Sequence, residues 1–193
     1  MYSWEAIQTI NSRSYTCGYC GSPLSSERGW RARNGPSGVY IATIYICHKC
    51  ASPTFFDIAD NQTPGIVFGN VVSDIPEENV SQLYEEARRT TGAGAYTAAV
   101  LCCRKLLMHI AVSKGANAGD TFINYVQFLA DKNFIPPDAK EWVDHIRKKG
   151  NEANHEISIM SKDDAEELLS FCEMLLKVIF EFPAIVKRRI ANP

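Results

Sequence analysis

The chain has 193 residues, of which 46% are hydrophobic and 22% are charged. This is the composition of an ordinary globular protein, and no uncharged apolar run is long enough to span a membrane. The net charge of -2 excludes a protein covered in basic surface for bulk nucleic-acid binding, but it leaves room for local basic patches.

The first predicted element is a short leading helix, because Trp4, Ile7 and Ile10 recur at three-residue steps. We expect it to pack on the domain that follows. Residues 1–5 lack the charged start and apolar centre of a secretory signal peptide, so we expect a cytoplasmic protein.

Two Cys-x-x-Cys pairs come next: Cys17 with Cys20, and Cys47 with Cys50 after 26 intervening residues. Each pair can present two thiolates from one tight turn, so two such turns supply the four ligands of a tetrahedral zinc ion. Residues 39–46 are rich in β-branched and aromatic side chains, which predicts a strand leading into the second pair. The sequence therefore predicts a zinc ribbon over residues 1–60, with Zn²⁺ as a structural cofactor.

Two other interpretations of the cysteines are a disulfide framework and a redox dithiol. Without a secretory signal an oxidising compartment is not expected, and two facing dithiols favour a metal over redox chemistry. A site closed by four sulfurs stabilises a fold and does not activate water. We expect His48, between the ligands of its pair, to point outward.

A basic segment, residues 27–34, lies in what we expect to be a loop between the cysteine pairs. Arg28, Arg31 and Arg33 surround Trp30 there. The arginines could neutralise phosphates while the indole stacks on a base, as in proteins that bind single strands. Alternatively, Trp30 packs under the ribbon and the arginines are solvated.

The rest of the chain changes character. Residues 61–79 have turn chemistry and are expected to be a connector, whereas residues 80–193 show helical periodicity. Helices are predicted over residues 77–90, 93–113 and 122–132, and from residues 137 and 161 onward. The predicted fold class is α+β, a small β ribbon followed by an all-α bundle of four or five helices.

The second of these helices is apolar on nearly every side, which places it at the centre of the bundle. Arg104 is therefore expected to form an ion pair with an acidic side chain of a neighbouring helix, because an unpartnered buried guanidinium is costly. Cys102, Cys103 and Cys172 are expected to be small buried thiols. The last helix is predicted to begin at Ser161 and to end or kink at Pro183.

Polar residues that could bind a ligand or take part in catalysis gather in residues 144–156. If this segment is helical, Arg147, Lys148, Asn151 and His155 share one face, which could hold a phosphate and transfer a proton near neutral pH. The alternative is a capped helix end, with cations that complement the helix dipole.

Residues 83–87, 99–107 and 146–156, which read LYEEA, AVLCCRKLL and IRKKGNEANHE, carry a resemblance to a known family. They resemble the bacterial family forty-one forty-five among the domains of unknown function, over roughly residues 80 to 183. Members of that family often carry a cysteine-pair ribbon in front. The family is similar to the wider HEPN group of helical domains, many of which are dimeric, metal-independent ribonucleases of phage defence, toxin–antitoxin and RNA-processing systems.

In catalytic HEPN proteins an arginine, the polar residue after it and a histidine a few positions further on converge across a dimer interface to cut RNA. The resemblance implies His155 as the proton-transferring residue, Asn151 as its polar neighbour, and Arg147 or Lys148 as the cation. Here seven residues separate Arg147 from His155, which is longer than the catalytic pattern.

The resemblance thus implies a homodimer that acts on RNA, as an endoribonuclease if the site is complete, in a bacterial or phage defence or counter-defence system. The alternative is a non-enzymatic module, in which ribbon and bundle bind protein or nucleic acid within a defence or restriction complex.

If the chain cleaves RNA, the wild-type protein should cut single-stranded RNA in the presence of a chelator and leave cyclic-phosphate ends. His155→Ala should lower the rate by about two orders of magnitude, the usual effect of losing a general acid or base. Gel analysis of labelled RNA measures both, and equal rates would exclude His155 from the reaction.

Overall fold

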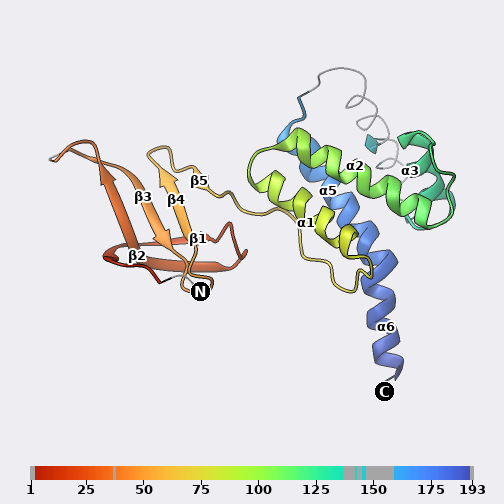
Figure 1. The fold of residues 1–193 in the computed structure, drawn as a ribbon, viewed down its shortest axis with the longest axis horizontal. Helices are drawn as coiled ribbons and strands as arrows, with labels where there is room; N and C mark the ends of the chain where they lie inside the picture. Colours follow the sequence, from red (N-terminus) through yellow and green to blue (C-terminus); the bar gives the residue numbers. More distant parts are fainter. Residues whose placement is uncertain (1–2, 37, 137–141, 143–144, 147–158, 192–193) are drawn as a thin grey trace. The chain divides into compact units, whose positions relative to one another are not determined.

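The computed structural model describes residues 3–36, 38–136, 142, 145–146 and 159–191 (Figure 1). The chain divides into two compact units, residues 1–67 and 68–193. A β-sheet occupies the first unit and helices form the second, which confirms the predicted α+β class.

The sheet is an antiparallel meander whose neighbouring strands follow the chain order. Among the described residues its strands are β1 Gln8–Thr16, β2 Pro23–Arg33, β3 Tyr40–Ile46, β4 Pro53–Asp57 and β5 Gln62–Thr63. β3 is the strand predicted over residues 39–46. Tyr15, Tyr45 and Phe56 pack ring against ring with centroids 5.4 to 6.0 Å apart, which gives the sheet an aromatic core.

The predicted leading helix is wrong. Residues 3–7 are not helical, and Ile10 lies within β1. Ala6 has a positive φ of 52°, which a helix does not allow, and its carbonyl accepts a hydrogen bond from the indole of Trp30. Trp4 packs on Trp30 with ring centroids 5.6 Å apart. Trp4 therefore contacts a residue far away in the sequence, and Ile10 belongs to a strand, so they do not form one face of a helix.

Parts of residues 61–79 belong to the two units. β5 pairs with β4 through Gln62 opposite Phe56, and Val72 is buried in the helical core. The boundary between the units lies at residues 67 and 68.

The second unit contains helices at the positions that the periodicity predicted, within a few residues. They are α1 Glu78–Gly92, α2 Tyr96–Ser113, α3 Phe122–Asp131, α5 Lys162–Leu176, the π-helical turn η2 Lys177–Glu181 and α6 Phe182–Ala191. Trp142, His145 and Ile146 are helical too, in the segment where a helix was expected from residue 137. Trp142 meets Phe171 edge to face at 5.0 Å, and Ile146 is buried.

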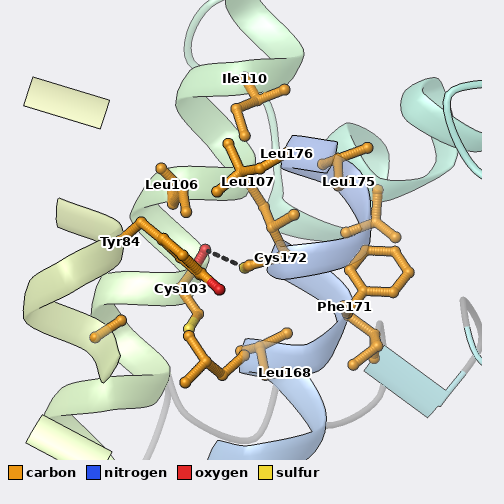
Figure 2. Packing of buried hydrophobic residues seen from close by; sticks show 14 of the residues in the cluster. Tyr84, Cys103, Leu106, Leu107, Ile110, Leu168, Phe171, Cys172, Leu175 and Leu176 are labelled. Atoms are coloured by element: carbon orange, nitrogen blue, oxygen red, sulfur yellow. Dashed lines mark hydrogen bonds between the residues drawn. The ribbon is translucent and has the colours of Figure 1, made fainter. Parts of the chain in front are cut away.

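Helix α2 lies against α1, α3 and α5 and forms the centre of the core (Figure 2). Cys103 and Cys172 are fully buried there, and the Cys172 thiol donates to the carbonyl of Cys103, as Figure 2 shows. Cys102 is half-buried. Within the described part of the chain, α2 alone is long and apolar enough to cross a membrane, and its burial in the bundle accounts for that composition.

The expected ion pair of Arg104 is not found among the described residues. Its side chain is only 4% exposed, no described group accepts a hydrogen bond from its Nη1, and the guanidinium lies over the ring of Phe122, 4.4 Å from the centroid. A cation–π contact therefore takes the place of the predicted carboxylate.

The last helix begins as predicted and continues further. Ser161 and Asp164 form a reciprocal capping box at the start of α5. Pro183 does not end the helix, which continues to Ala191. The wider π-helical turn η2 ends at Glu181, two residues before Pro183, where it accommodates the proline ring and the missing N–H.

A polar network attaches residues 68–70 to α1 and α5. Glu173 accepts hydrogen bonds from the backbone N–H of Asn70 at 2.8 Å, from its side chain at 2.9 Å, and from Lys177. Arg88 donates to the carbonyls of Phe68 and Gly69. Burial raises the pKa of Glu173, but the hydrogen bonds from Lys177 and Asn70 outweigh it, so the net pKa is lowered.

Replacing Glu173 with glutamine should lower the free energy of unfolding by about 1.5–3 kcal/mol near neutral pH, since charge-assisted hydrogen bonds disappear. Because the folded pKa is depressed, this contribution is present above the unfolded pKa of about 4.3 and disappears as the pH falls through the folded value. Urea unfolding at neutral and acidic pH, followed by helical circular dichroism, measures the difference.

Glu166→Gln is the matched control, because Glu166 pairs with Lys162 across a surface turn at 3.6 Å. That change should cost no more than about 0.5 kcal/mol. Equal effects of the two substitutions would contradict the anchoring role of Glu173.

Candidate metal centre

Both Cys-x-x-Cys pairs lie in turns between neighbouring strands. Cys17 and Cys20 join β1 to β2, and Cys47 and Cys50 join β3 to β4, so the meander brings both turns to the same end of the sheet. Each turn is closed by the same two backbone hydrogen bonds, at 2.8 and 3.0 Å, between its first cysteine and the residues four and five positions further on, respectively. The two turns are therefore near copies of one local structure.

The four sulfur atoms converge. The Cys17 and Cys50 sulfurs are 3.7 Å apart, those of Cys20 and Cys47 are 3.8 Å apart, and all four lie within 4.8 Å of one another. A tetrahedral ion with metal–sulfur bonds of about 2.3 Å needs sulfurs about 3.8 Å apart, whereas a disulfide needs about 2.05 Å. The cluster can therefore hold one metal ion, and His48 is exposed outside it.

The thiols differ in acidity. Burial raises the pKa of Cys17 to about 12 and also raises that of Cys47. Burial acts the same way on Cys20, but hydrogen bonds from Ser22 and the neighbouring thiols lower its pKa to about 6. Among the thiols with a shifted pKa, Cys20 is the one whose surroundings favour the thiolate, the form that binds a metal cation.

The backbone conformation of the turns limits which residues can occupy some of their positions. Gly21 and Ala51 occupy equivalent positions after the second cysteine, with φ of 67° and 58°. Gly18 faces the backbone of Pro64, and an added Cβ would come within 2.3 Å of its carbonyl oxygen. The first turn therefore needs glycine at position 18 to fit against residues 64–65.

The predicted basic loop is a strand. Residues 27–33 belong to β2, and residues 29–33 pair with β3, with Trp30 opposite Ile44 and Arg31 opposite Thr43. Successive side chains of a strand alternate between faces, so Trp30 lies on the face opposite to Arg31. The half-buried Trp30 packs on Trp4, which supports the packing interpretation of the tryptophan.

Arg31 and Arg33 gather around Tyr40. Their guanidinium carbons lie 4.8 and 4.5 Å from the centre of the Tyr40 ring, and Arg33 donates to the phenolic oxygen at 2.6 Å. That hydrogen bond, with the nearby positive charges, lowers the pKa of Tyr40. No ion pair of either arginine with an acid occurs within the described residues. We call Arg31, Arg33 and Tyr40 the arginine–tyrosine cluster.

Tyr40 was missed from the sequence. It lies opposite Arg33 because the β2–β3 register shifts between Ala32 and Arg33. The turn residues between Arg33 and Tyr40 indicate a hairpin, but the irregular register decides which side chains meet. Arg28 is exposed further along β2, outside the cluster.

The other group of predicted site residues, Arg147, Lys148, Asn151 and His155, lies outside the described residues. Their convergence remains a prediction from the sequence and from the family resemblance.

Substituting Cys47 by serine should remove the bound metal, because a serine hydroxyl does not replace a thiolate ligand. Elemental analysis of the purified chain should show one metal ion for the wild type and for the control Cys102→Ser, and none for Cys47→Ser. Proteolysis should then cleave the first unit while residues 68–193 resist. Full metal content in Cys47→Ser would contradict the site.

Comparison with known proteins gave one match. No curated protein and no solved structure matched the chain. A family model described as a domain of unknown function, DUF4145, matches residues 85–191, which cover α2, α3, α5 and α6 and most of α1. The match covers more than half of the sequence, and the chain therefore belongs to the DUF4145 family.

Proposed function

We propose that this protein binds single-stranded RNA through the arginine–tyrosine cluster, on a sheet held by a structural zinc ion. The observation that carries the proposal is the pair of guanidinium groups on one tyrosine ring, without an acidic partner in the described part of the chain. Uncompensated cations beside an exposed aromatic ring, here 45% exposed, are suited to a phosphate chain with bases.

The cluster is preorganised for such a ligand. An arginine fork can donate two parallel hydrogen bonds to a phosphate, and its planar face can stack on an unpaired base. Tyr40 restrains both side chains through its ring and its hydroxyl oxygen. Binding then costs less side-chain entropy than it would for two free arginines.

Zinc is the proposed metal, because four thiolates in a closed tetrahedral set suit zinc better than metals that prefer oxygen or imidazole ligands. The ion would stabilise the two cysteine turns and, through them, the start of β2 and the end of β3, which lie at the same end of the β2–β3 pair. It would supply no catalytic position, since all four ligands come from the protein.

The resemblance of the helical unit to HEPN domains favours RNA over DNA as the nucleic acid that the protein binds. The same resemblance is the basis for proposing a role in phage defence or counter-defence. Homodimer formation and RNA cleavage are separate expectations. They depend on Arg147, Lys148, Asn151 and His155 and do not follow from the arginine–tyrosine cluster.

Reversing both charges, with Arg31→Glu and Arg33→Glu together, should weaken binding of single-stranded RNA by about tenfold or more, because two attractive interactions with phosphates become repulsive. The salt dependence of affinity should become shallower, by about 0.7 units of the log–log slope for each phosphate of the single strand that the protein no longer neutralises. Fluorescence anisotropy with a labelled RNA at several salt concentrations measures both quantities.

Arg89→Glu is the matched control, since Arg89 is an exposed arginine on α1 in the other unit. It should leave affinity nearly unchanged, and Tyr40→Phe should have an intermediate effect because it keeps the ring and removes the hydroxyl. Equal weakening by the double variant and by Arg89→Glu would indicate nonspecific attraction. Tighter binding of DNA than of RNA with the same sequence would reject RNA as the ligand.

A further inference from the structure

An apolar stripe runs along one side of the C-terminal helices. Its residues recur every four positions from α5 through η2 into α6: Met174, Val178, Phe182, Val186 and Ile190. The side chains of Phe182, Val186 and Ile190 are 50, 54 and 76% exposed, and no described residue of α6 is buried. From Phe182 onward the stripe is therefore a helix face that the described residues of the helical unit leave uncovered, whereas Met174 packs partly against the core.

The π-helical turn keeps the stripe on one side. In an α-helix, residues four apart drift by about 40° around the axis, so five such residues would wind away from a common face. A π-helical turn holds more residues per turn and reverses part of that drift. Because η2 lies in the middle of the stripe, Met174 and Ile190 stay closer to one face than in a continuous α-helix.

The stripe is hollowed. One depression of about 570 Å³ is lined by Phe68, Met174 and Lys177, among others, and a second of about 750 Å³ is lined by Val178, Val186 and Ile190. The two depressions share Phe182. A groove of this kind, with anchors at four-residue steps, suits another helix laid along it.

The charges beside the groove indicate which kind of helix can bind there. Lys187 lines the second depression, and Arg189 follows Phe182 by about two turns on the same side. Neither forms an ion pair with a described acid, whereas Arg188 points to Asp74 at 2.5 Å. Glu173, the carboxylate at the groove, is already satisfied by Asn70 and Lys177. Two copies of α6 would place cations against cations.

We infer that this groove binds an amphipathic helix of a partner protein that carries carboxylates beside its apolar residues. The match is one of periodicity and charge, because the shallow groove is apolar along its centre and flanked by cations that form no ion pair with a described acid. An anionic membrane would match the charge but would not fill two depressions. The site lies wholly in the second unit and is independent of RNA binding by the first.

The test uses the full chain and a fluorescein-labelled synthetic peptide that forms an amphipathic helix of about four turns, with leucines at three- and four-residue steps and glutamates beside them. A second peptide has lysine in place of each glutamate. Vesicles of phosphatidylcholine and phosphatidylserine form a third arm, and anisotropy and co-sedimentation report binding.

The glutamate peptide should bind in preference to the lysine peptide. Val186→Asp should weaken that binding by about tenfold or more, as expected for a central anchor, and Ile190→Asp should do so independently. Lys187→Glu with Arg189→Glu should reverse the preference between the peptides. Leu101→Asp, a control at a 47% exposed position on α2, should change nothing.

Four results would overturn the inference. These are equal binding by all variants, wild-type preference for the lysine peptide, vesicle binding that Val186→Asp abolishes, and a dimer that Val186→Asp dissociates. The third would assign the stripe to a membrane and the fourth to a second copy of this chain.

Discussion

The convergence of four cysteine sulfurs is the constraint on which the first unit depends. The described part of the sheet buries few large apolar side chains, and its fully buried residues include Cys17 and Cys47 themselves. A sheet of this size rarely folds on apolar burial alone, so a metal bound by the four thiols would contribute folding free energy directly. The sulfurs meet because two similar turns emerge at the same end of the meander.

The arginine–tyrosine cluster lies toward the other end of the same strands. β2 leaves the first cysteine turn and β3 returns to the second, so Arg33 and Tyr40 flank the hairpin farthest along the chain from both. Strain or metal loss at the cysteine turns would therefore reach the cluster through backbone hydrogen bonds between two strands. The cysteine turns and the arginine–tyrosine cluster thus lie toward opposite ends of the same two strands.

Local sequence signals predicted much of this molecule, and contacts between distant residues account for what they missed. The four converging cysteines were predictable because each pair is closed within four residues, and the helices because their apolar periodicity is long. Trp4, Ile7 and Ile10 misled the prediction of a leading helix, since Trp4 packs on the distant Trp30 and Ala6 has a positive φ. The position of Tyr40 beside Arg33 depends on an irregular strand register, which the sequence does not reveal. Arg104 contacts an aromatic ring where a carboxylate was expected.

The π-helical turn between α5 and α6 also determines how the helix residues after it are rotated around the helix axis. Ordinary α-helical winding of Lys177–Glu181, with no residue removed, would rotate everything after it by roughly 90°, because each residue turns the chain further in an α-helix than in a π-helix. Arg188 would then turn away from Asp74, and Phe182 would leave the line of Met174. The winding of these five residues thus sets the direction in which the side chains of α6 face.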